Sequence, residues 1–77
     1  MRIFVLTEID STDYKWCYNE TFYEKEKAVA RMKEMYHDDV VEREDLVIKS
    51  ELKSDSAYAE MVDGVELSWN IKETEIQ

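Results

Sequence analysis

The sequence lacks proline and has one glycine, one cysteine and one histidine among 77 residues. Because an internal disulfide needs two cysteines, the lone Cys17 excludes one, and the paired Cys and His spacing of a zinc site is absent. No apolar run reaches the ~18 residues that a membrane-spanning helix needs. With no proline and no glycine-rich stretch to mark a linker, we expect residues 1–77 to form a single domain.

Basic residues are also scarce, since 10 Lys and Arg stand against 19 Asp and Glu, a formal net charge of -9. A chain of this charge repels a polyanion, which argues against direct binding of DNA or RNA. It is nevertheless 44% hydrophobic and 12% aromatic, which is too apolar for a disordered chain. The apolar start at residues 3–6 is too short for a signal-peptide core, so we expect a soluble, cytoplasmic protein.

The first third of the chain has the pattern of a β-hairpin. Residues 2–9 are rich in branched and aromatic types, residues 10–13 are polar, and residues 14–19 alternate aromatic and polar side chains. If the loop pairs Ile9 with Tyr14, each of the two faces of the hairpin carries its own group of apolar side chains. One group is Ile3, Val5, Trp16 and Tyr18, and the other is Phe4, Leu6 and Cys17.

An amphipathic helix is expected next. Thr21-Phe22-Tyr23-Glu24 has the spacing of a capping box, which predicts that a helix begins there. The apolar side chains that follow recur at helical spacing and form one face, namely Ala28, Val29, Met32, Met35 and Tyr36. We expect the helix to end near Asp38-Asp39; the alternative is a helix that continues to Asp45, because no breaker intervenes.

The second half of the chain predicts three strands. Branched residues between Leu46 and Leu52 mark the first, and Asp63-Gly64 separates two alternating runs that form the others. A two-residue type I′ turn at Asp63-Gly64 would place Tyr58 opposite Trp69. In that register Ala57, Ala59 and Met61 face solvent.

These elements predict an α+β fold of order ββαβββ, an antiparallel sheet of about five strands with one amphipathic helix packed on it. A single helix covers only one face of a sheet, whereas the first hairpin is apolar on both faces. We therefore expect a homodimer, and the residues predicted at its interface are Phe4, Leu6 and Cys17. The alternative is that the acidic segment folds over the second face.

No residue set in the sequence identifies a reaction. His37 is the only imidazole and lies near a helix end, and Cys17 has no base beside it, so neither forms an activated nucleophile. The loop with Asp10 and Asp13 lacks the ligand spacing of a calcium-binding loop, and the single glycine is used in a turn. We expect a protein that is not an enzyme, with no catalytic residues, no metal and no cofactor.

The acidic residues are unevenly distributed along the chain. Residues 38–45 contain five acids and one base, whereas residues 23–37 contain three acids and four bases. A concentrated acidic surface suits docking on a basic groove of another protein, including one that normally holds nucleic acid. The alternative is a solvated surface that keeps the protein soluble. The candidate partner-binding residues are Asp38, Asp39, Glu42, Glu44 and Asp45.

The layout of the chain also resembles a known group of proteins. The resemblance rests on the opening strand that ends in Thr7-Glu8, on residues 22–28 at the start of the helix, and on residues 69–73 near the end. Together they resemble small single-domain proteins of bacteriophages and mobile elements, a group that includes acidic inhibitors of host defence enzymes of the anti-CRISPR type. The resemblance implies a bacterial host cytoplasm and carries over no catalytic residue.

We therefore predict a non-enzymatic protein-binding inhibitor or adaptor, phage-encoded, that docks an acidic surface on a basic, nucleic-acid-handling host protein such as a CRISPR effector. The alternative is an oligomeric protein that binds or sequesters a small nucleotide ligand. In that case the stacking residues would be aromatic, namely Tyr14, Trp16, Tyr18 or Trp69.

Overall fold

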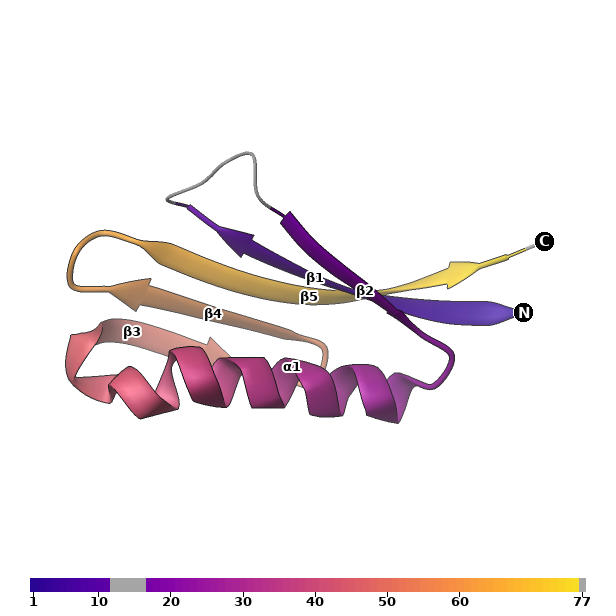
Figure 1. Ribbon diagram of the computed structural model, residues 1–77, viewed down its shortest axis with the longest axis horizontal. Helices are drawn as coiled ribbons and strands as arrows, with labels where there is room; N and C mark the ends of the chain where they lie inside the picture. The colour runs from indigo at the N-terminus through magenta and orange to yellow at the C-terminus, as the bar shows by residue number, and fades with distance from the viewer. Residues whose placement is uncertain (12–16, 77) are drawn as a thin grey trace.

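A computed structural model describes residues 1–11 and 17–76. It contains a five-stranded antiparallel sheet with one helix across one face (Figure 1). This confirms the predicted fold class and element order. The elements are β1 (Arg2–Asp10), β2 (Cys17–Phe22), α1 (Lys25–Asp39), the short 3-10 helix η1 (Val41–Leu46), β3 (Val47–Leu52), β4 (Ser56–Met61) and β5 (Glu66–Glu75).

The strand order across the sheet is β2-β1-β5-β4-β3. The middle strand is therefore β5, which pairs with β1 from the opposite end of the described chain and with β4 across a short turn. In this register Leu6 lies opposite Ile71, and Glu8 lies opposite Trp69. We call the side of the sheet under α1 the covered face and the other side the open face.

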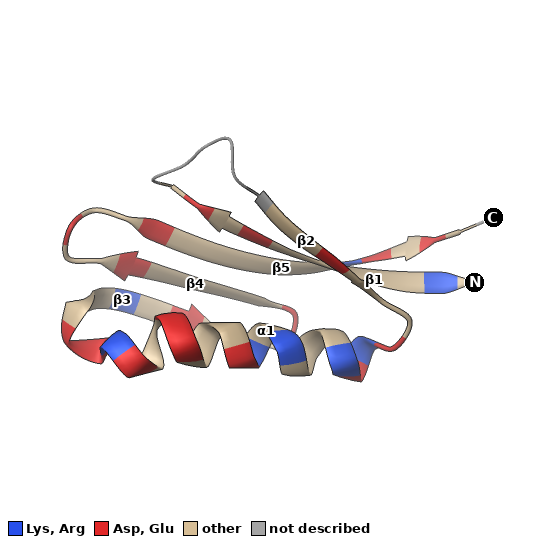
Figure 2. Ribbon diagram, in the orientation of Figure 1, with Lys and Arg blue, Asp and Glu red and all other residues tan. Residues whose placement is uncertain are grey.

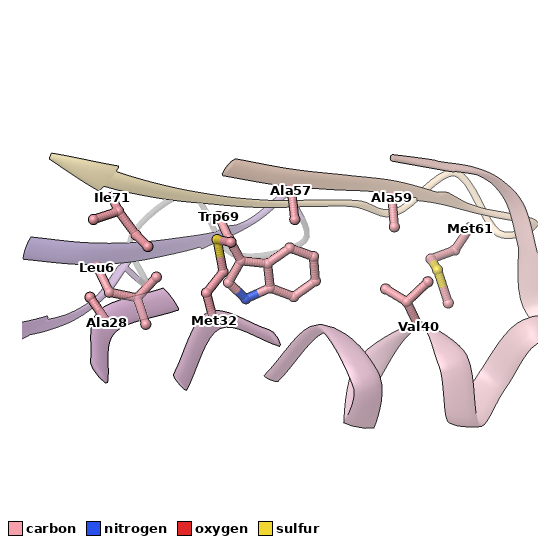
Figure 3. Close-up of a cluster of buried hydrophobic side chains, with 9 residues drawn as sticks. All are labelled: Leu6, Ala28, Met32, Val40, Ala57, Ala59, Met61, Trp69 and Ile71. Carbon is pink, nitrogen blue, oxygen red and sulfur yellow. The ribbon is translucent and has the colours of Figure 1, made fainter. Parts of the chain in front are cut away.

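The core lies between α1 and the covered face, as Figure 3 shows. Ala28 and Met32 are 0% exposed, which confirms the predicted buried face of the helix. The Trp69 ring is 1% exposed and makes an edge-on contact with Tyr36, with ring centroids 5.8 Å apart. The buried cluster is Leu6, Ala28, Met32, Val40, Ala57, Ala59, Met61, Trp69 and Ile71.

The register of the first hairpin differs from the predicted one. Ile9 lies opposite Cys17 instead of Tyr14, which lies outside the described residues with Trp16. The covered face then holds Phe4 and Leu6, because their neighbours on β5 are on that face.

Phe4 and Leu6 were predicted at a homodimer interface, and the burial of Leu6 contradicts this placement for Leu6. Leu6 is 0% exposed within a single chain, so no second copy can contact it. Phe4 is half-buried and packs against the same core. The side chain of Cys17, the third predicted interface residue, lies outside the described part of the chain.

The predicted capping box is also wrong. Thr21 remains in β2 opposite Val5, and α1 begins at Lys25 after an N-cap residue, Glu24, that makes no side-chain capping bond. Ladder pairing with β1 outweighs a local cap, which contributes only about 1 kcal/mol. The predicted end is correct, since α1 ends at Asp39, and η1 then carries helical turns to Leu46 in 3-10 geometry.

The turn between β4 and β5 has three residues, not two. Gly64 N–H donates to the Met61 carbonyl at 3.0 Å, and Met61 N–H donates to the Val65 carbonyl at 2.8 Å. Only Gly64 among the described residues has positive φ, at 88°, which is the arrangement of a type I turn followed by a glycine bulge.

The extra turn residue shifts the β4–β5 register by one and so reverses the two faces of β4 relative to β5. Trp69 lies opposite Ala57 instead of Tyr58, whose predicted pairing is therefore wrong. Ala57 and Ala59, predicted to face solvent, are 6% and 0% exposed beneath α1. Their small side chains leave room for the indole ring, which explains why this register packs better.

The two faces of β1 predict unequal effects of truncation. Leu6→Ala should lower the free energy of unfolding by about 3 kcal/mol, because it opens a cavity in the core. Ile9→Ala, on the open face and 47% exposed, should lower it by under about 1 kcal/mol. Urea denaturation followed by tryptophan fluorescence measures both, and equal losses would contradict the assignment of faces.

The turn geometry predicts a purely conformational penalty at Gly64. A Cβ added there meets no atom within 4 Å, so only the positive φ opposes substitution. Gly64→Ala should lower the free energy of unfolding by about 1 kcal/mol, and Gly64→Asn by less, since Asn tolerates this region. Thermal denaturation followed by circular dichroism tests this order, and an unchanged stability of Gly64→Ala would count against the bulged turn.

Candidate binding site at the acidic end

Acidic residues that are distant in sequence gather at one end of the molecule. Figure 2 shows them at the end of α1, along η1, at the β4–β5 turn and at the adjoining strand ends, whereas the first half of α1 is mostly basic. The end of β1 is tied to the start of β5, because Ser11 N–H donates to the Glu66 carbonyl at 3.0 Å. We call this region the acidic end; it comprises Asp10, Asp38, Asp39, Glu42, Glu44, Asp45, Asp63 and Glu66.

A pocket of about 670 Å³ opens within the acidic end. Its walls combine carboxylates with apolar side chains, and Arg43 is the one basic residue among the described residues that line it. The acids come from β1, from the last residue of α1 and from the β4–β5 turn. The residues that line it are Glu8, Asp10, Asp39, Arg43, Leu46, Met61, Val62, Asp63, Val65 and Leu67.

Glu8 is the most unusual group in this pocket. It is 7% exposed, and it is the sole buried polar or charged residue in the described part of the chain. Trp69 Nε1–H donates to Glu8 Oε2 at 2.6 Å. Burial raises the pKa of the Glu8 carboxyl, more than the Trp69 hydrogen bond lowers it, and the charges of Asp39 and Asp10 raise it further. A cation entering the pocket would stabilise the ionised carboxylate.

Asp39 reinforces this environment from the helix side. Burial raises the pKa of its carboxyl above the ordinary value; Arg43 opposes the shift, and the charges of Asp38 and Asp10 add to it. The pocket therefore holds two carboxyls, those of Glu8 and Asp39, whose negative charge is only partly compensated within the chain. This is an environment that favours a positively charged group.

The structure brings the five predicted partner-binding residues to one end but not to one surface. Asp39 lines the pocket. Asp38 and Glu42 lie beside His37, with oxygens 3.9 and 3.6 Å from its Nδ1. Glu44 borders a separate hollow over β3, and Asp45 is exposed. The predicted set thus divides between the pocket and its surroundings.

Sequence reasoning missed Glu8 and Asp10 as members of the same site. The signal for Glu8 was present, because it continues the alternation of Phe4 and Leu6 and so shares their covered face. A charged residue in such a series indicates a buried polar group. Without the correct face of β1, that signal could not be interpreted.

The residues considered for nucleotide stacking and for metal binding do not form such sites in the described part of the chain. Trp69 is too deeply buried to stack on a ligand, and the Tyr18 hydroxyl donates to Glu20 Oε1 at 2.8 Å. Among residues 1–11 and 17–76, no three His, Cys, Asp or Glu side chains are arranged to hold a metal ion. Neither helix in this part of the chain is long and apolar enough to cross a membrane.

No protein family model, curated protein or solved structure matches this chain.

The raised pKa of Glu8 predicts how stability depends on pH. Folding raises this pKa above its ordinary value of 4.5, so the unfolded chain loses the proton first as pH rises. Stability contributed by protonated Glu8 is full at low pH and is lost as pH rises through the folded-state pKa. Glu8→Gln keeps an acceptor for the Trp69 N–H and removes this titration.

The free energy of unfolding of the wild type should therefore fall, relative to Glu8→Gln, between about pH 4 and about pH 8. Urea denaturation at both pH values measures the difference. Glu75→Gln, which alters an exposed carboxyl, is the matched control and should follow the wild type. Parallel pH profiles of the wild type and Glu8→Gln would refute the assignment.

Proposed function

We propose that this protein is a non-enzymatic inhibitor or adaptor that docks its acidic end on a basic surface of another protein, with an Arg or Lys side chain of that partner in the pocket. The main observation in support is that acids from separate elements converge around one pocket, which contains the buried Glu8 carboxylate. Glu8 also accepts the Trp69 N–H, but the acids around it come from three separate elements and line the same pocket.

The pocket suits a long cationic side chain because its walls are mixed. Leu46, Val65 and Leu67 offer apolar surface to the methylene stem, as Arg and Lys stems require. The carboxylates of Glu8 and Asp39 offer acceptors to the charged head. Charge-assisted hydrogen bonds between such groups are about twice as strong as neutral ones.

The partner we propose is a nucleic-acid-handling protein of a bacterial host, such as a CRISPR effector, bound by a phage-encoded inhibitor in the host cytoplasm. Two features support this choice. Carboxylates at the acidic end can occupy the place of phosphates in a basic groove. The layout of the chain resembles that of phage proteins, a group that includes acidic inhibitors of the anti-CRISPR type.

Nucleotide binding has less support. The described residues that line the pocket include four acids and one base, which disfavours a phosphate group. Trp69 is inaccessible, and Tyr14 and Trp16 lie outside the described residues.

Charge reversal tests the proposal against a set of purified CRISPR effectors and nucleases in a biosensor assay. Replacing Asp38, Asp39, Glu42 and Glu44 by Lys should abolish binding while circular dichroism shows an intact fold. A control that reverses Glu24, Glu26, Glu73 and Glu75, all exposed and outside the acidic end, changes the net charge equally and should still bind. Binding should weaken between about 50 and about 300 mM salt, because exposed charges are screened, and should compete with nucleic acid.

Two single substitutions distinguish binding through the pocket from binding through the acids around it. Asp39→Asn and Glu44→Gln each remove one negative charge, but only Asp39 lines the pocket. Asp39→Asn should weaken binding about tenfold, the loss of one charge-assisted contact. Glu44→Gln should weaken it about twofold or less, in keeping with a peripheral charge. Equal affinities of the wild type and the variant with Lys at positions 38, 39, 42 and 44 would contradict the proposal.

A further inference from the structure

β3 is an edge strand of the sheet and carries exposed apolar side chains. It is the last strand in the sheet order, and in the described chain only β4 pairs with it (Figure 1). Every residue of β3 except Val47 is exposed. Ile48 and Leu52 are 62% and 43% exposed. An edge with these side chains is a site where another strand can add.

The unpaired backbone groups of this edge can be assigned. Lys53 N–H donates to the Ser56 carbonyl at 2.8 Å, just beyond the end of the β3–β4 ladder. Because hydrogen-bonding direction alternates along an antiparallel strand, Glu51 and Lys49 also direct their N–H and C=O groups toward β4. Ser50 and Leu52 therefore direct theirs outward, where no described strand accepts them.

We propose that β3 pairs antiparallel with β3 of a second copy of this chain, about a two-fold axis at Ser50. Ser50 then lies opposite Ser50 of the second copy, and the two residues exchange their outward hydrogen bonds. Lys49 lies opposite Glu51 of the second copy, and Ile48, at an irregularity of the β3–β4 pairing, lies beside Leu52 of the second copy. The two sheets become one continuous sheet.

Charge complementarity favours this register over an axis at either neighbouring residue of β3. A two-fold axis at Lys49 or at Glu51 would place identical charges opposite each other, which is unfavourable. The axis at Ser50 instead forms two Lys–Glu pairs and buries two apolar pairs. The other edge strand, β2, has Glu20 as its one charged residue and no base, so it offers no comparable match to itself.

The arrangement also keeps the acidic ends apart. β3 begins beside the acidic end and runs away from it, as Figure 1 shows. Antiparallel pairing therefore places the two acidic ends at opposite ends of the joined sheet. No residue of β3 lines the pocket, so this inference stands independently of the proposed function.

Sedimentation equilibrium of the wild type, up to about 1 mM, should show a reversible monomer–dimer equilibrium. Glu51→Lys sets two positive charges opposite each other at both Lys49 positions of the dimer and should raise its dissociation constant about tenfold or more. It also lowers the net negative charge, so weaker association cannot come from general repulsion. The double variant Lys49→Glu/Glu51→Lys should restore the wild-type constant.

Matched variants complete the test. Glu75→Lys makes the same charge change at an exposed site outside β3 and should leave the dissociation constant within about twofold. Because Lys49 also lies opposite Glu60 of β4, circular dichroism must show that the variants fold.

A cross-link provides a second, independent measurement. In a Cys17→Ser background, Ser50→Cys places two thiols on Cα atoms about 5.5 Å apart, within the range of a disulfide. Oxidation should give a disulfide-linked dimer, whereas Asp55→Cys in the same background should not. A wild type that stays monomeric at every concentration, or a dimer that Glu51→Lys leaves unchanged, would overturn the inference.

Discussion

The burial of the Trp69 ring between α1 and the sheet is the packing constraint on which the rest of the structure depends. The indole occupies the middle strand of the sheet, and it fits because the residue opposite it on β4 is Ala57. Figure 3 shows the ring between Met32 of α1 and that alanine. A larger side chain at either contact would force the helix away from the sheet. The register of β4 and β5, the position of α1 and the identity of the open face all follow from seating this one ring.

The same ring couples the core to the acidic end. Its N–H needs an acceptor because it is buried, and the acceptor is Glu8 on the neighbouring strand. The sheet thereby holds a carboxylate at the base of a pocket whose other acids come from α1 and from the β4–β5 turn. Stability and electrostatics are linked here, since any change that releases Glu8 from Trp69 leaves a buried donor without a partner.

Local patterns in the sequence were sufficient for the elements and insufficient for their pairing. The buried face of α1 could be predicted because its periodicity depends on residues within a few turns. The faces of β4 could not be predicted, because Asp63-Gly64 fits either a two-residue or a three-residue loop. The choice between these loops decides on which face of the sheet each β4 side chain lies. Thr21 has the spacing of a helix cap, yet its pairing with Val5 keeps it in a strand. Glu8 was missed for the same reason, since its burial depends on β5, which lies far along the chain from β1.

The central position of β5 has a consequence for how the chain folds. β5 is the last strand in the order of synthesis, yet β1 and β4 meet only through it. The β1–β2 and β3–β4 hairpins emerge as separate two-stranded pieces, which are marginally stable alone. Closing the distance between β1 and β5 requires ordering nearly the whole chain at once, a pairing of high contact order that slows folding. Until β5 arrives, both hairpins expose unpaired edges, and only its insertion converts them into one cooperative sheet.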